Sequence, residues 1–152
     1  MRALIAMIAA AVLALSLAAF EPRTDDPHRR IYCQVVPDSP TRDNGDAPRR
    51  VVGQVRFWCD KPGADRLSVT LRLQRQKSNG AWVDVAKSVF TVRRGQTVRT
   101  DTQSYRTRVV SARCTSGTFR TVITGSSLAR GVRETYRMTA AAAVDPCRPA
   151  LF

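Results

Sequence analysis

Residues with catalytic side chains are scarce in this sequence. It has one histidine, His28, and 12 acidic residues against 25 basic ones. Nucleophilic catalysis needs a base beside the nucleophile, and His28 lies in a stretch without a periodic apolar pattern. No pair of carboxylates is marked for sugar hydrolysis, and no glycine-rich phosphate loop is present. The sequence therefore predicts no enzymatic activity, no catalytic residue and no cofactor.

Long apolar runs are also absent, except at the N-terminus. Arg2 is followed by an apolar run over residues 3–19 that only Ser16 interrupts, and Ser16 and Ala18 are small residues suited to a cleavage site. This pattern predicts an export signal over residues 1–18, followed by a flexible lead-in over residues 19–30. An uncleaved anchor is the alternative, because about 17 residues are near the lower limit for a membrane span. We expect a secreted, extracellular protein that contacts a membrane only through its export signal.

Helical periodicity is missing as well. No stretch of the expected mature chain up to residue 127 shows a sustained apolar stripe with helical spacing, whereas residues 67–74 alternate strictly between apolar and polar. The β-strand signals cover residues 31–36, 51–59, 67–74, 82–90, 98–101, 105–114 and 119–124. About seven strands separated by regular turn signals predict an antiparallel β-sandwich over residues 31–127.

Three local features refine this prediction. Pro37 is expected to end the first strand before a loop over residues 37–48, and the Val109-Val110 pair suggests a β-bulge. Residues 94–96 read as a tight turn and residues 125–130 as a Gly/Ser loop. The tail, residues 128–152, contains an alanine run and is tethered by Cys147. It fits an extra strand or a short helix, and we favour the strand.

Several short motifs occur in one order along the chain: WCDKP at 58–62, LSVTLRLQR at 67–75, GAWVDVA at 80–86 and CTSGTFR at 114–120. This order resembles small, mostly uncharacterised secreted proteins of actinobacteria that share a C..G.(Y/F)R hairpin. The resemblance covers residues 31–127 and implies an immunoglobulin-like sandwich of about seven to eight strands in a high-GC, Gram-positive organism. It implies no established activity and no functional residue.

An even number of cysteines in an exported chain predicts two disulfides, and the absence of a C-x-x-C knuckle argues against a metal site. One pairing joins Cys59 to Cys114 and Cys33 to Cys147, because the second and sixth strands of such a sandwich commonly face each other. Four cysteines allow three pairings. A second pairing joins Cys33 to Cys59 and Cys114 to Cys147, because antiparallel neighbours bring the start of one strand beside the end of the next. We favour the first pairing only slightly.

The most distinctive surface property is a net charge of +13, to which lysine contributes only Lys61, Lys77 and Lys87. Arginine binds phosphate and carboxylate through its planar fork. If Arg106, Arg108 and Arg120 share an outward face, they form a cationic stripe. The candidate anion-binding residues are Arg93, Arg94, Arg99, Arg106, Arg108 and Arg120.

These observations predict a secreted binding or adhesion module whose basic face docks an anionic cell-wall polymer or a protein partner. Specific nucleic-acid binding is not expected, because only Trp58 has an outward position suited to base stacking. A small-ligand carrier and a secreted inhibitor are the alternatives. The carrier would need an apolar cavity between the sheets.

Overall fold

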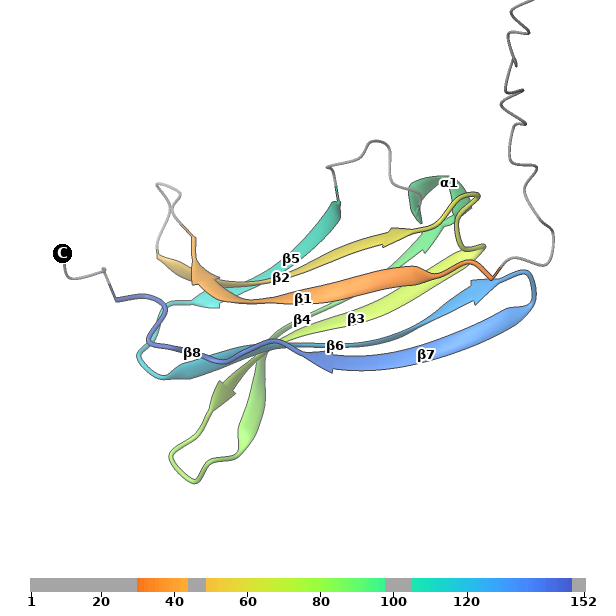
Figure 1. Ribbon diagram of the computed structural model, residues 1–152. Helices are drawn as coiled ribbons and strands as arrows, with labels where there is room; N and C mark the ends of the chain where they lie inside the picture. Colours follow the sequence, from red (N-terminus) through yellow and green to blue (C-terminus); the bar gives the residue numbers. More distant parts are fainter. Residues whose placement is uncertain (1–29, 44–48, 98–104, 149–152) are drawn as a thin grey trace, which may run out of the picture.

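Two antiparallel sheets face each other in the computed structural model, which describes residues 30–43, 49–97 and 105–148 (Figure 1). The smaller sheet has the order β1-β2-β5 and contains β1 (Cys33–Arg42), β2 (Arg50–Cys59) and β5 (Arg106–Arg113). The larger, five-stranded sheet has the order β4-β3-β6-β7, with β8 paired to β6. Its strands are β3 (Arg66–Gln76), β4 (Trp82–Arg93), β6 (Thr118–Ala129), β7 (Val132–Thr139) and β8 (Ala143–Val144). The predicted all-β fold is thus confirmed, whereas the predicted export signal lies outside the described residues.

Strict alternation builds the core between the sheets. On β3, Leu67, Leu71 and Leu73 are fully buried and alternate with half-buried polar residues. Phe57 from β2 and Phe119 from β6 meet them from the two sheets and are equally inaccessible. Because successive side chains of a strand point to opposite faces, this pattern leaves the polar residues of β3 on the outer face of the larger sheet.

The first strand is longer than predicted. Pro37 does not end β1, which continues to Arg42, and Pro37 lies opposite Val55 of β2. β1 is an edge strand, with no neighbouring strand on its outer side. Proline is tolerated in such a strand because its missing N–H group can face outward, where no strand accepts a hydrogen bond. The predicted loop is therefore wrong for residues 37–42, and residues 44–48 lie outside the described part.

The predicted bulge in β5 is also wrong. β5 pairs with β2 without a register shift from Arg50 opposite Arg113 to Phe57 opposite Arg106. Val109 is 56% exposed and Val110 is buried, so the two valines occupy opposite faces of a regular strand. The register shifts elsewhere, between Asp38 and Thr41 and between Leu73 and Gln74.

The tail forms strands, as favoured from the sequence. β6 runs through the predicted Gly/Ser loop to Ala129, and β7 pairs with it. Tyr136 of β7 crosses Gly125, its register partner on β6, and its hydroxyl donates to the Ser68 carbonyl at 3.3 Å. A Cβ atom on Gly125 would lie 2.6 Å from that hydroxyl, so only glycine lets the tyrosine approach. Burial raises the pKa of Tyr136 above its ordinary value.

The disulfides follow the second pairing, Cys33 with Cys59 and Cys114 with Cys147. The favoured pairing is wrong because β5 runs antiparallel to β2 in the same sheet. Arg113, at the end of β5, lies opposite Arg50, at the start of β2, so Cys114 and Cys59 lie at opposite poles. Cys33 lies directly opposite Cys59 in the β1–β2 ladder.

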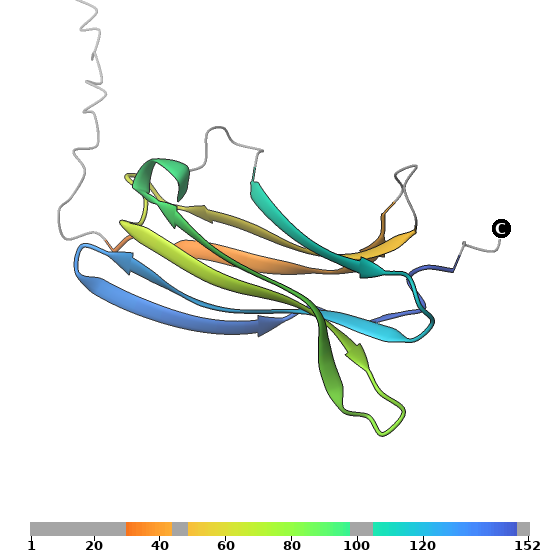
Figure 2. The same cartoon turned by 180° about the vertical axis from the view of Figure 1, so that it is seen from behind.

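A short helix, α1 (Arg94–Thr97), follows β4 where the sequence predicted a tight turn (Figure 2). Its last residue, Thr97, is buried, and the Thr97 hydroxyl donates to the Arg94 carbonyl at 2.8 Å. The predicted strand over residues 98–101 lies outside the described residues. In the part of the chain that the structure describes, no helix has the length and apolarity to cross a membrane.

Candidate functional site

The predicted stripe of Arg106, Arg108 and Arg120 does not form. Arg106 and Arg108 lie opposite Phe57 and Val55, which are both buried. The two arginines are therefore on the inner face of the smaller sheet, the face that is turned toward the other sheet. They stay exposed because β5 is an edge strand, and the Arg108 guanidinium lies 5.8 Å from the ring centroid of Phe90 in the other sheet. These two arginines therefore border the open side of the sandwich.

Arg120 belongs to the outer face of the larger sheet. Its guanidinium lies 4.1 Å from the centroid of Trp82, and its Nε donates to the side-chain oxygen of Gln74 at 2.9 Å. The Gln74 amide donates to Asp84 at 2.7 Å, and Arg72 pairs with the same carboxylate at 3.4 Å. Arg72 is therefore paired with the Asp84 carboxylate, and Arg120 is held by the Trp82 ring and the Gln74 side chain.

Arg93 and Arg94 differ although they are adjacent. Arg94 pairs with Asp65, which also accepts the backbone N–H of Arg130 at 2.9 Å. The hydrogen bond from Arg94 and that from Arg130 lower the pKa of Asp65. Arg93, at the end of β4, lies opposite Arg66 of β3 and has no acidic partner among the described residues. Arg99 lies outside the described part of the chain.

Arg93 belongs to a larger feature, which we call the arginine row: Arg93, Arg66 and Arg133. Arg66 lies opposite both Arg93 on β4 and Leu128 on β6, and Leu128 lies opposite Arg133 on β7. The three arginines thus lie on one outer face, on β4, β3 and β7, with Leu128 of β6 between Arg66 and Arg133. Within the described residues none of the three has an ion pair. Because like charges are not neutralised within the row, it presents a concentrated positive potential.

A band of hydroxyl side chains lies beside the arginine row on the same face. Ser68 of β3 lies between Thr91 of β4 and Ser126 of β6, and the Ser68 and Thr91 hydroxyls are 3.2 Å apart. Thr70 and Thr124 form the next rung, and Arg137 of β7 lies opposite Thr124. Such a surface offers neutral donors and acceptors next to free guanidinium groups.

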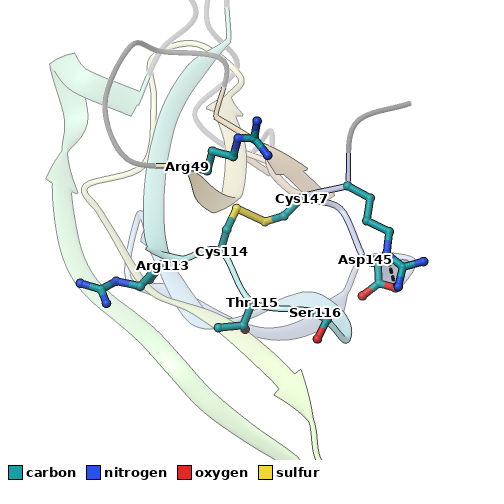
Figure 3. Close-up of a pocket in the computed structure, with 8 residues that line it drawn as sticks. Arg49, Arg113, Cys114, Thr115, Ser116, Asp145 and Cys147 are labelled. Carbon is teal, nitrogen blue, oxygen red and sulfur yellow. Dashed lines mark ion pairs between the residues drawn. A yellow bond between two sulfur atoms is a disulfide. The ribbon is translucent and has the colours of Figure 1, made fainter. Parts of the chain in front are cut away.

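A second basic site is a pocket of about 510 Å³ beside the Cys114–Cys147 disulfide, which we call the pole pocket. Figure 3 shows Arg49 and Arg113 on different sides of the disulfide, with Thr115 and Ser116 nearby. The described residues that line it are Arg49, Arg113, Cys114, Thr115, Ser116, Asp145, Cys147 and Arg148.

Asp145 is the only acidic side chain among the described residues that line the pole pocket, and its oxygens are engaged. One carboxylate oxygen accepts the Gly117 N–H at 2.5 Å, and the other pairs with Arg148 at 3.4 Å. Arg49 and Arg113 have no acidic partner in the described ranges. The pocket therefore keeps a net positive charge and a volume within the usual range of small-molecule sites.

The outer face of the smaller sheet has a different character. The Trp58 and Tyr105 rings lie 4.6 Å apart, and the Arg56 guanidinium lies 5.4 Å from the Tyr105 centroid. Asp38 accepts three hydrogen bonds from Arg56, the shortest at 2.7 Å, and this hydrogen bonding and the charge of Asp38 raise the pKa of Arg56. Because Arg56 is neutralised, this face is less suited to anions than the arginine row.

Sequence reasoning missed most of these basic residues. Arg66 and Arg133 are far apart in the chain, and only the order β4-β3-β6-β7 brings them onto one face. The alternation of residues 67–74 would have placed Arg66 on the outer face, but nothing local indicates its neighbours. Arg49 and Arg113 meet at one pole because β2 and β5 are antiparallel partners.

The described residues contain no group of three or more histidine, cysteine or acidic side chains arranged to hold a metal. In comparisons with known proteins, no family model matches the chain and no curated protein is similar to it.

Proposed function

We propose that this protein is a secreted, non-enzymatic binding module that docks an anionic cell-envelope polymer on the outer face of its five-stranded sheet. The arginine row carries the proposal, because Arg66, Arg93 and Arg133 share one face without an ion pair among the described residues. Two disulfides support an oxidising compartment outside the cytosol. The fold that we propose is immunoglobulin-like, as in the actinobacterial proteins that the sequence resembles.

The geometry of the row suits a linear polymer rather than a single ion. Neighbouring strands lie about 4.8 Å apart, so Arg66 and Arg133, separated by one strand, are about 10 Å apart at their Cα atoms. The row therefore runs across the strands on an open surface. Successive phosphate or carboxylate groups of one polymer chain can each meet a guanidinium, and the hydroxyl band can bind the groups between them.

The alternative of a small-ligand carrier is less well supported. The space between the sheets is filled by large buried side chains, among them Phe57, Phe119 and Leu71. A carrier needs an apolar cavity there. The pole pocket, in contrast, lies at the end of the sandwich beside a disulfide.

The proposal is tested by binding the protein to immobilised poly(glycerol phosphate), a model of a phosphodiester wall polymer. Basic residues at an anionic surface contribute about 1 kcal/mol each, so the variant Arg66→Gln/Arg93→Gln/Arg133→Gln is expected to bind about 100-fold more weakly at low salt. Binding should also fall strongly in 1 M salt, where the Debye length is about 3 Å.

The matched control is Lys61→Gln/Lys77→Gln/Arg106→Gln, which removes the same charge away from the arginine row. We expect it to keep most of the affinity, because Lys61 lies in the turn after β2, Lys77 in the turn after β3 and Arg106 on β5. Equal losses in both triple variants would show that only total charge matters. The absence of binding by the unmodified protein at low salt would overturn the proposal.

A further inference from the structure

The two disulfides have very different surroundings. Cys33–Cys59 joins two residues paired within one sheet. Cys33 is half-buried, whereas Cys59 is 2% exposed among Ile31 and Ala64, which are also buried. Cys114–Cys147 instead lines the pole pocket, and both of its cysteines are half-buried. The two disulfides thus differ in that both cysteines of Cys114–Cys147 line a pocket, whereas one cysteine of Cys33–Cys59 is enclosed in the core.

We propose that the pole pocket is a thiol–disulfide exchange site, which takes a low-molecular-weight thiol that carries carboxylate groups. The proposal is independent of polymer binding, because the arginine row and the pole pocket share no residue. It assigns a chemical role to the pocket that the packing of the fold does not require.

The charges at the pocket favour this chemistry in two ways. Arg49 and Arg113 have no acidic partner within the described residues, so they attract an anionic thiol and raise its local concentration. Nearby cations also stabilise thiolates, and a thiolate is both the attacking and the leaving group in the exchange. The carboxylate of Asp145 opposes this effect only weakly, because Arg148 and the Gly117 N–H already neutralise it.

The exchange balances without an external oxidant. The thiolate of the small thiol attacks Sγ of Cys147, a new S–S bond forms to it, and the Cys114–Cys147 bond breaks. Its electron pair stays on Sγ of Cys114, which leaves as a thiolate at the wall of the pole pocket. A second small thiol can then attack the mixed disulfide, which releases the oxidised small molecule and the Cys147 thiolate.

Opening this bond loosens the end of the chain. Cys147 follows β8, whose two residues pair with Thr118 and Phe119 of β6, and the Asp145 N–H donates to the Gly117 carbonyl at 2.9 Å. These backbone contacts are few, so the disulfide is the strongest link between the last described residues and the end of β5. Exchange at the pole pocket would therefore release this segment without breaking the two main sheets.

The experiment compares three thiols of different charge on the oxidised full chain: anionic glutathione, neutral 2-mercaptoethanol and cationic cysteamine. Rates are expressed per thiolate, and quenching by alkylation followed by peptide mass spectrometry locates each opened disulfide. At low salt we expect Cys114–Cys147 to react about three to ten times faster with glutathione than with 2-mercaptoethanol, and slowest with cysteamine. This order should disappear in 1 M salt.

The variant Arg49→Gln/Arg113→Gln is expected to lose the preference for glutathione, whereas Lys77→Gln/Arg106→Gln, with the same charge change, should keep it. Equal rates for the three thiols at low salt, or faster opening of Cys33–Cys59, would overturn the proposal. The salt dependence of the unmodified protein gives the same answer if a variant does not fold.

Discussion

Replacing Gly125 by alanine should destabilise the protein far more than the loss of a typical strand glycine. Gly125 lies on β6, and a Cβ atom there would meet the Ser68 carbonyl oxygen and lie 2.6 Å from the Tyr136 hydroxyl and 2.8 Å from its Cζ atom. The carbonyl belongs to the neighbouring strand, so the backbone has to shift to relieve the clash. Tyr136 also has to withdraw from the position that burial and its hydrogen bond to Ser68 define.

Two costs add up in this variant. Overpacking of a filled site costs about 1–3 kcal/mol, and a lost hydrogen bond about 1 kcal/mol. Together they give about 2–4 kcal/mol, which corresponds to a fall in Tm of roughly 6–16 °C for a domain of this size. The free energy of unfolding from urea titration and the Tm from circular dichroism measure the effect independently.

The control is Gly95→Ala in α1. A Cβ atom there meets no other atom within 4 Å, and the residue is helical, so stability should stay unchanged or rise by about 0.4–1 kcal/mol. A second comparison repeats Gly125→Ala in a Tyr136→Ala background, where the alanine should cost less because the ring is absent. An equal cost in both backgrounds would refute the assigned clash with Tyr136.

Three further predictions concern single contacts. Because burial raises the pKa of Tyr136, the folded state keeps the phenolic proton at a pH where the unfolded state loses it. The free energy of unfolding should therefore fall as the pH rises above about 10. Tyr136→Phe should remove much of this fall in a series of Tm measurements at increasing pH. Asp38→Asn should cost about 0.5–1 kcal/mol in urea titration, and less in high salt, because Arg56 pairs with Asp38 at a partly exposed site; no salt dependence would contradict this. Arg108→Ala should lower stability by about 0.5–1 kcal/mol, since its guanidinium covers Phe90, and a larger loss in Arg106→Ala would argue against that contact.

The sequence predicts the strands well where burial alternates regularly. Residues 51–59 and 67–74 correspond closely to β2 and β3, because each has one face in the core. The prediction of strand ends is less successful where one residue type is compatible with two different structures. Pro37 reads as a strand end, but at a sheet edge it is tolerated, and edge position is a property of the whole sheet.

The candidate site is harder to predict because it depends on strand order. The sequence indicates which arginines point away from the core on one strand, but not which strand lies next to it. Arg106 and Arg108 were expected beside Arg120, yet β5 pairs with β2 while β6 pairs with β3. The wrong choice of disulfide pairing has the same origin, because β5 lies beside β2 in one sheet and not across the core from it. Local patterns contain no information on such long-range pairing.

The positions of the two disulfides determine how the protein would respond to a pulling force. A load that enters near Cys33 and leaves near Cys147 passes through both covalent bonds, which bridge sequence separations of 26 and 33 residues. The segments inside these two loops are then shielded, and only the stretch between Cys59 and Cys114 can be drawn out. A chain held at both ends would thus keep the segment that contains β6 and β7 from being extended while β3 and β4 lengthen, and opening the Cys114–Cys147 bond would add that segment to the extensible length.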